Sequence, residues 1–235
     1  GAFFNGSDFV YPVCVNFEHK RLFPGDIGPM TGEMGTLMYY SQPTTVVKET
    51  LLKMKEKLAA SKYVGYFDIN CIANGRGVYP LECTCRFGYP TISIQMEGIH
   101  TPMGEMLYRL AHGESFELKV KRGFQVGVVI AVPPFPFDDT QKAKMYKDSA
   151  IVLKKQSFEG FHLGDVKLVE GDWKLAGDSG YALVITGSGP TVETAQRQVY
   201  NRVSNILLQN MYYRTDIGYR WSKDSDRLHT WGYLY

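Results

Sequence analysis

The segment from Val64 to Arg86 has the sequence pattern of a β-hairpin, and it constrains the fold more than any other part of the chain. Two runs suited to strands, 64–72 and 78–86, flank the turn-forming stretch Asn74-Gly75-Arg76-Gly77. Such Asn-Gly turns join antiparallel strands. Because side chains alternate along a strand, two polar groups must each share a face. One group is Asp68 and Asn70; the other is Glu82, Thr84 and Arg86.

The length of the turn decides whether these two groups meet. A three-residue turn, 74–76, places Asp68 opposite Glu82, whereas a two-residue Asn-Gly turn puts them on opposite faces, because a one-residue slip inverts every side chain. Two directly opposed carboxylates destabilise a sheet unless a cation lies between them. Mg²⁺ suits such oxygen ligands, completed by substrate phosphates. From the residues alone, a solvated polar face without a ligand is the favoured interpretation.

The rest of the chain alternates between hairpin and helix patterns. Residues 2–17 predict a second hairpin, and 44–61, 101–113 and 192–209 predict helices from their apolar spacing and capping residues. The stretch from Gly25 to Gly35 contains four glycines and predicts a loop that is mobile until substrate binds. The character changes after Phe116, so a boundary near 119–123 separates two units without a shared sheet. This mixture predicts an α+β fold.

Composition and charge argue against several classes of protein. The net charge of +2 is too small for a protein held to nucleic acid by a strong basic field. No apolar run approaches the length of a membrane span. The four cysteines lack C-x-x-C zinc spacing, so we expect buried free thiols in a reducing cytoplasm. These patterns predict a cytoplasmic protein with no nucleic-acid or membrane partner.

Four motifs, in order along the chain, resemble those of glycinamide ribonucleotide synthetase (phosphoribosylamine–glycine ligase), an ATP-grasp ligase family. Glu18-His19-Lys20-Arg21 is similar to the family's D-H-K-R, and residues 25–35, GDIGPMTGEMG, resemble its G-D-x-G-P-N-T-G-G-M-G. Residues 81–90, LECTCRFGYP, are similar to L-E-F-N-x-R-F-G-D-P, and residues 212–218, YYRTDIG, to F-Y-R-x-D-I-G. Together the motifs span nearly the whole chain, which makes the resemblance specific.

The resemblance implies an architecture and an activity. Residues 1–120 are expected to form the second lobe of an ATP-grasp domain, an antiparallel sheet with helices, and residues 121–235 a small α+β C-terminal domain. The implied reaction joins glycine to 5-phosphoribosylamine with ATP and Mg²⁺ or Mn²⁺, through an acyl phosphate that the amine attacks. The expected partner is the missing N-terminal part of the same enzyme. Because ATP lies between two lobes and this chain supplies one, we expect it to be inactive alone.

The resemblance also implies roles for individual residues. The expected catalytic cations, facing the phosphates or the acyl phosphate, are Lys20, Arg21 and Arg86. The expected substrate-binding residues are Asp26, Gly28, Thr31, Gly32 and Asp216. Glu82 and Thr84 occupy the positions of family metal ligands, and Asp68 occupies a metal position of many other ATP-grasp enzymes.

Several positions depart from the commonest family pattern. Met30 replaces Asn, Glu33 replaces Gly, Thr84 replaces Asn and Tyr89 replaces Asp. These departures bear on substrate identity, so two alternatives stay open. One is an ATP-grasp ligase for another carboxylate and amine pair, and the other is a noncatalytic binding domain that kept the fold. The retained charged motif residues argue against complete loss of the chemistry: Lys20, Arg21, Asp26, Glu82 and Arg86.

Overall fold

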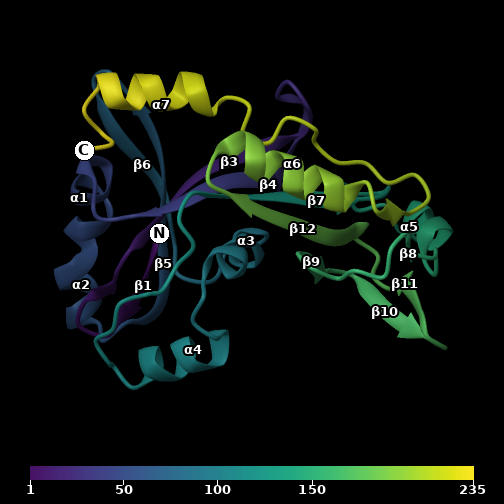
Figure 1. Cartoon of the computed structure of the whole chain (residues 1–235), viewed down its shortest axis with the longest axis horizontal. Helices are drawn as coiled ribbons and strands as arrows, with labels where there is room; N and C mark the ends of the chain where they lie inside the picture. The colour runs from purple at the N-terminus through teal and green to yellow at the C-terminus, as the bar shows by residue number, and fades with distance from the viewer.

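The structure, a computed structural model, describes residues 1–235 and is built around two antiparallel sheets (Figure 1). The first sheet has the strand order β2-β1-β5-β6. Its strands are β1 (Ala2–Asn5), β2 (Phe9–Val10), β5 (Val64–Asn74) and β6 (Gly77–Thr84). The second sheet has the order β3-β4-β7-β12-β9. Its strands are β3 (Val13–Phe23), β4 (Ile27–Ser41), β7 (Phe124–Ala131), β12 (Tyr181–Gly189) and β9 (Phe161–Leu163).

Helices cover both faces of the first sheet. On one face lie α1 (Thr45–Glu49), a 3₁₀ turn (Leu51–Met54) and α2 (Lys55–Ala60), and on the other lies α4 (Met103–Ala111). The single helix predicted over 44–61 is interrupted at Thr50, where φ is −118° and ψ is −82°. Its predicted apolar stripe is nevertheless buried, because Val47, Leu51 and Leu58 pack with the strand residues of this layer.

The second sheet lies between α3 (Thr91–Gly98) and α6 (Val192–Val203). Val126, Val128 and Ile130 of β7 join the core with α6, while a Cβ on Gly127 would lie 2.2 Å from Ile94 of α3. Since neighbouring residues of a strand point to opposite faces, the two helices cover opposite sides of β7. This explains why seven of its eight residues are buried.

The two halves of the chain share this second sheet, so the prediction of two units without a common sheet is wrong. Strand β4 of the first half pairs with β7 of the second, from Gly35↔Val128 to Tyr39↔Phe124. The physical reason lies in β7, whose apolar residues point to both faces; such a strand needs neighbours on both edges as well as covered faces. β4 supplies one edge and β12 the other.

The predicted Gly25–Gly35 loop is also wrong, because most of it belongs to strand β4. A tight turn at Pro24–Asp26 connects β3 to β4, and the pairing resumes at Phe23↔Ile27 and Arg21↔Met30. Gly35 is required by close packing: its φ is +153°, and a Cβ there would lie 2.5 Å from the carbonyl oxygen of Gly127. This glycine therefore permits β4 and β7 to approach each other closely. The glycine content of the segment, taken alone, indicates an irregular loop.

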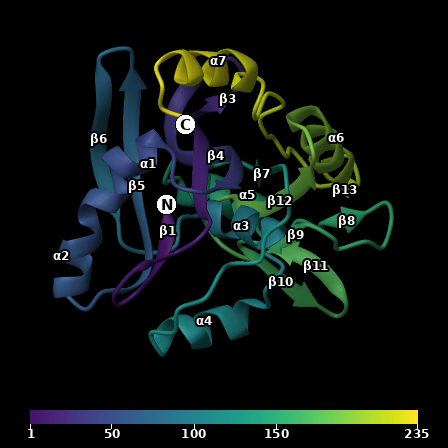
Figure 2. The same ribbon diagram turned by 60° about the vertical axis from the view of Figure 1, so that its left-hand side comes forward.

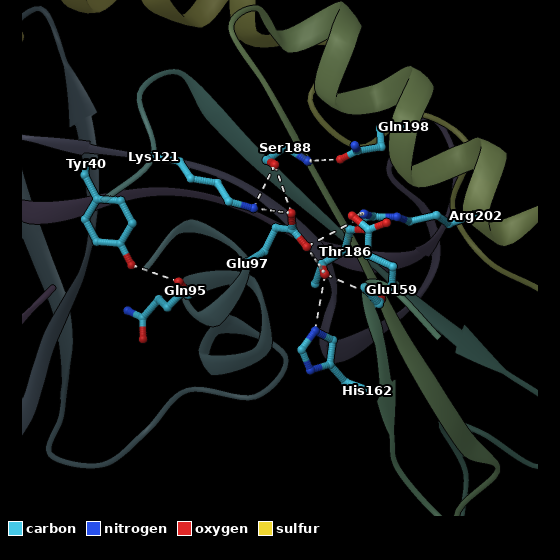
Figure 3. A network of polar contacts seen from close by, with 11 residues as sticks. Tyr40, Gln95, Glu97, Lys121, Glu159, His162, Thr186, Ser188, Gln198 and Arg202 are labelled. Atoms are coloured by element: carbon cyan, nitrogen blue, oxygen red, sulfur yellow. Dashed lines mark hydrogen bonds and ion pairs between the residues drawn. The ribbon is translucent and has the colours of Figure 1, made fainter. Parts of the chain in front are cut away.

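A network of buried polar contacts fastens α3 to β12 and α6 (Figure 3). The Glu97 carboxylate accepts hydrogen bonds from Lys121 at 2.9 Å, from the Ser188 hydroxyl at 2.9 Å and from the Thr186 hydroxyl at 3.0 Å. Arg202 of α6 lies 3.3 Å from the same carboxylate. Burial raises the pKa of Glu97, but these donors outweigh it, so the pKa is lowered overall. The network therefore joins the two halves a second time.

The remaining elements form small additions around this frame. The hairpin β10 (Val166–Val169) and β11 (Asp172–Leu175) projects from one end, and β8 (Val152–Leu153) pairs with β13 (Ile206–Leu207). Helix α5 spans Thr140–Tyr146, and α7 (Trp221–Thr230) crosses near the tip of the β5–β6 hairpin. None of the helices has the length and apolar character that a membrane span requires.

Candidate functional site

A cavity of about 750 Å³ opens between β3, the β5–β6 hairpin and α7, and we call it the main cavity. β3 belongs to the second sheet and β5–β6 to the first, so the cavity lies where the two sheets meet. Its strand walls carry a polar set of side chains: Asn16, Glu18, Lys20, Asp68, Asn70 and Glu82. Acids, amides and a lysine therefore converge on one space from two separate layers.

Glu82 faces this cavity because of a β-bulge. The turn holds only two residues, since Asn74 pairs with Gly77, and by itself it would put Glu82 on the face opposite to Asp68. The register then shifts between Asn70 and Cys71, leaving Leu81 as the extra residue, so that Asn70 pairs with Glu82 and Asp68 with Thr84. The three-residue turn that the paired metal site required is absent, but the bulge brings Asp68 and Glu82 onto a shared face all the same.

Hydrogen bonds along the cavity wall connect the two sheets. The Asn70 amide donates to Glu82 Oε1 at 3.0 Å and approaches Glu18 Oε2 at 3.5 Å. Glu18 Oε2 also lies 2.6 Å from Lys20 Nζ. Burial lowers the pKa of Lys20, but the hydrogen bond and charge of Glu18 outweigh it and raise the pKa overall. Lys20 is therefore a cation held beside the carboxylates.

The proposed metal ligands offer oxygen atoms on one sheet face. Glu82 and Asp68 line the main cavity, and Thr84 pairs with Asp68 in the ladder. Asp68 is largely buried and lies 3.3 Å from the amino group of Gly1. No three His, Cys, Asp or Glu side chains gather closely enough to hold an ion by themselves. Two carboxylates with hydroxyl and amide oxygens fit Mg²⁺ or Mn²⁺ only when phosphate oxygens supply further ligands.

The structure separates the three cations expected to act together. Lys20 lines the main cavity, whereas Arg21 and Arg86 are not among its lining residues. The Arg21 guanidinium donates to the Gly28 carbonyl at 2.8 Å. Arg86 follows β6, is exposed, and donates to the Phe87 carbonyl at 2.8 Å. Only Lys20 therefore points at the acidic residues in this structure.

Asp26 and Asp216, expected to bind substrate, are both held by Arg214. Arg214 has no exposed surface and lies 2.8 Å from Asp26 and 2.7 Å from Asp216. Arg220 is a second, exposed partner of Asp26, at 2.9 Å. Hydrogen bonding from Arg214 holds the pKa of Asp26 below its usual value. The cluster ties the β3–β4 turn to the C-terminal motif, because the Gly25 amide also donates to Asp216 at 2.9 Å.

The other expected substrate-binding residues lie along β4. The Gly28 carbonyl accepts from Arg21, and the Thr31 hydroxyl donates to the Lys20 carbonyl at 2.8 Å. No atom lies within 4 Å of a Cβ built on Gly32. None of the three lines the main cavity. The structure brings Lys20, Asp68 and Glu82 together, and it places these β4 residues along the adjacent hairpin.

Sequence reasoning missed Asn16 and Glu18 of the main cavity, and it missed the burial of Glu33, which does not line the cavity. Glu18 and Asn16 share the face of β3 that carries Lys20, and their alternation along the strand was a signal that could have identified them. Glu33 is almost completely buried and accepts hydrogen bonds from the hydroxyls of Thr36 and Thr91. Burial, together with the charge of Glu18, raises its pKa well above the usual value.

The four cysteines differ in their burial. Cys14 is buried, Cys71 is half-buried, and Cys83 and Cys85 are exposed; all four are free. The prediction of buried thiols is therefore wrong for Cys83 and Cys85. Cys83 alternates with Glu82 and Thr84 on the edge strand β6, and Cys85 follows the end of that strand; neither lines the main cavity.

The two-sheet frame and its acidic cavity define the class: the chain has the α+β fold of the ATP-grasp ligases. Over 92% of its length it is similar to a crystal structure of phosphoribosylamine–glycine ligase from Thermotoga maritima. The identity is 26%, the TM-score 0.68, and 54% of that chain is covered. Phosphoribosylglycinamide synthetase from Anaerococcus prevotii shares the fold, with 13% identity, a TM-score of 0.54, and coverage of 88% of this chain and 51% of that one.

Sequence comparison points to the same group of proteins. Residues 125–220 match the family described as "Phosphoribosylglycinamide synthetase, C domain". A phosphoribosylamine–glycine ligase from Leptospira interrogans is 30% identical over 229 residues, covering 91% of this chain and 51% of the relative. One from Listeria monocytogenes is 28% identical, covering 92% and 52%. The family match covers less than half of the chain, and the chain spans about half the length of the curated relatives it matches.

Proposed function

We propose that this chain supplies part of the nucleotide and metal site of an ATP-dependent ligase that joins glycine to 5-phosphoribosylamine. The observation that carries the proposal is the convergence of Lys20, Asp68 and Glu82 on the main cavity from two sheets. The names of the relatives supply the substrates. ATP, glycine and 5-phosphoribosylamine would be the ligands, and the remaining half of the ligase would be the partner.

Each residue has a defined part in this proposal. Glu82 and Asp68, assisted by Thr84, would hold Mg²⁺ or Mn²⁺ together with phosphate oxygens. When bound there, the ion would offset negative charge on the phosphates. Lys20, kept charged by Glu18, would stabilise the charge that develops as the phosphoryl group moves to the glycine carboxylate.

The remaining assigned residues form a supporting group. Arg21 and Arg86 would reach the phosphates or the acyl phosphate once substrate is bound, because both residues are exposed, Arg21 on β3 itself and Arg86 just after the end of β6. Asp26 would act from the β3–β4 turn and Asp216 from the C-terminal motif, both held by Arg214, with Gly28, Thr31 and Gly32 along β4. These five residues would position the β3–β4 hairpin so that it contacts the amine substrate or glycine.

Calorimetric titration of the chain with ATP tests this proposal. We expect binding in the presence of Mg²⁺ and much weaker binding in EDTA. Glu82→Gln should remove the Mg²⁺-dependent part, because an amide is a poorer metal ligand than a carboxylate. Glu105→Gln, on an exposed position of α4, is the matched control and should bind as the unaltered chain does. An ATP affinity that changes neither on removal of Mg²⁺ nor in Glu82→Gln would contradict the proposal.

A further inference from the structure

The last fifteen residues, 221–235, form one wall of the main cavity, and we call them the C-terminal strap. They lie beyond the residues that match the family profile, which end at Tyr219-Arg220. Six strap residues line the cavity: Trp221, Asp224, Arg227, Leu228, Trp231 and Leu234. The polar floor of the cavity therefore faces a helix that the family match does not include.

The strap is fixed at both of its ends. At its start, the Trp221 ring packs against Phe17 and Tyr39, with ring centroids 5.1 and 5.5 Å apart. At its end, the amides of Thr45 and Val46 donate to the carbonyls of Tyr235 at 2.7 Å and Tyr233 at 3.0 Å. Figures 1 and 2 show α7 crossing between β3 and the tip of the β5–β6 hairpin. The strap is thus part of the frame.

One face of α7 points into the cavity. Asp224, Arg227, Leu228 and Trp231 are spaced by three and four residues, which places them on the same side of a helix. Arg227 forms none of the ion pairs in the structure, although it lines the cavity. The guanidinium of Arg227, which has no ion-pair partner, and the indole ring of Trp231 therefore both line the cavity together with the strand residues.

The cavity changes in character along the hairpin. Asp68 and Glu82 lie away from the turn of the hairpin, and Lys20 lies on β3. The apolar residues Ile72 and Ala73 lie toward the turn, and Leu81 lies directly beside Glu82. Trp231 lies beside that turn: its Nε1 would be 3.2 Å from a Cβ on Gly75, and the Tyr233 hydroxyl donates to the Asn74 carbonyl at 2.9 Å. The five residue-to-residue steps from Gly77 to Glu82 span roughly 16 Å.

We propose that the C-terminal strap holds the base of the nucleotide, with Trp231 packed against the purine ring and the phosphates directed toward Lys20 and Glu82. The inference rests on the proposed function, since it assumes that the main cavity takes ATP. An aromatic ring beside apolar side chains favours a flat apolar base, and the charged end favours phosphates with a metal ion. The strap thereby sets which end of the cavity receives the base.

The test compares ATP with inorganic tripolyphosphate, both with Mg²⁺, in calorimetric titrations of the full chain. For Trp231→Ala we expect ATP binding about ten-fold weaker, because base–aromatic stacking is lost. Tripolyphosphate binding should stay unchanged, since it has no base. Trp231→Phe should restore most of the ATP affinity. Trp173→Phe, on β11 away from the cavity, is the matched control and should leave both affinities unchanged.

The outcomes separate this inference from the proposed function. Suppose that the unaltered chain binds ATP with Mg²⁺. If Trp231→Ala then weakens the binding of ATP and of tripolyphosphate equally, or weakens the binding of neither compound, the strap does not hold the base and this inference alone fails. If the unaltered chain binds neither compound, the nucleotide site itself is wrong and both fail. Thermal melts accompany each variant, and Trp231→Leu, which keeps apolar bulk without an aromatic ring, replaces Trp231→Ala if that variant unfolds.

Discussion

Arg214 is a charged side chain with no exposed surface, and its two carboxylate partners make it a strong test of buried electrostatics. Replacing it with Met leaves Asp216 without its arginine partner and Asp26 with only the exposed Arg220. Removing one partner of a buried ion pair typically costs about 3–5 kcal/mol. We therefore expect Arg214→Met to lower the free energy of unfolding by about that amount in urea denaturation.

Arg220 provides the control for this prediction. It contacts the same Asp26 at 2.9 Å, but 63% of its side chain is exposed. Solvent screens such pairs, so Arg220→Met should cost less than about 1 kcal/mol. Equal losses for the two variants would mean that the burial of Arg214 contributes nothing to the strength of the cluster.

Glu33 makes the folding stability of the chain depend on pH, and the direction of this dependence follows from its raised pKa. Burial and the nearby Glu18 raise its pKa well above the usual value, so the folded state holds its proton more tightly than the unfolded state does. Its stabilising contribution is complete below the ordinary carboxyl pKa and is lost as the pH rises through the raised value. Glu33→Gln keeps a hydrogen-bonding side chain but removes this titration.

We therefore expect Glu33→Gln to gain stability relative to the unaltered chain as the pH rises from 4.5 to 8. Urea midpoints across this range measure the difference, and Glu105→Gln, at an exposed position, should show no such trend. A difference between Glu33→Gln and the unaltered chain that stays constant with pH would contradict the assignment of Glu33.

At the level of elements, α3 and β7 pack so closely that a glycine is needed between them. A Cβ on Gly127 would lie 2.2 Å from Ile94, a distance that no real contact shows. We expect Gly127→Ala to destabilise the chain by about 1–3 kcal/mol through overpacking. Gly104→Ala in α4 is the control, since nothing lies within 4 Å of its Cβ, and it should be neutral or stabilising by up to about 1 kcal/mol. Thermal denaturation compares the two variants.

The β5–β6 hairpin shows both the reach and the limit of sequence reasoning. Alternation identified which polar residues share a face on each strand, and the structure confirms a common face for Asp68, Glu82 and Thr84. The three-residue turn that we expected this common face to require is absent from the structure. Which face of the sheet Glu82 occupies depends on both the length of the turn and the bulge at Leu81. A bulge has no local sequence signature strong enough to predict.

The other elements were predictable where they depend on local sequence, and not where they depend on distant partners. The apolar stripe of 44–61 and the helix after Pro102 were predictable because periodicity is a local property. The extent of β4, the position of α3 and the course of the C-terminal strap were not, since each depends on a distant partner. The acids of the candidate site could be identified from their motifs, whereas Glu18 and Asn70 became neighbours only when the two sheets met.

For the whole molecule, the shared sheet predicts a single cooperative unit. Residues 121–235 expressed alone would keep β7 and lose β4, exposing one edge of a strand that is buried on both faces. We expect this piece to aggregate or to lack a cooperative melt, whereas the full chain melts in one transition. Size-exclusion chromatography and circular dichroism measure both. A monomeric 121–235 piece with its own sharp melt would show that the two halves are independent.

The β4–β7 ladder also bears on how genes for such proteins can be rearranged. Its five backbone pairs, from Gly35↔Val128 to Tyr39↔Phe124, cross the point where a sequence profile would divide the chain. A recombination event at that point would have to recreate these pairs with whatever segment it acquired, so successful fusions and permutations should avoid it. The exposed turn Glu170-Gly171 of the projecting β10–β11 hairpin breaks no such ladder. Insertions tolerated during evolution, and new chain ends chosen by an engineer, are therefore expected there.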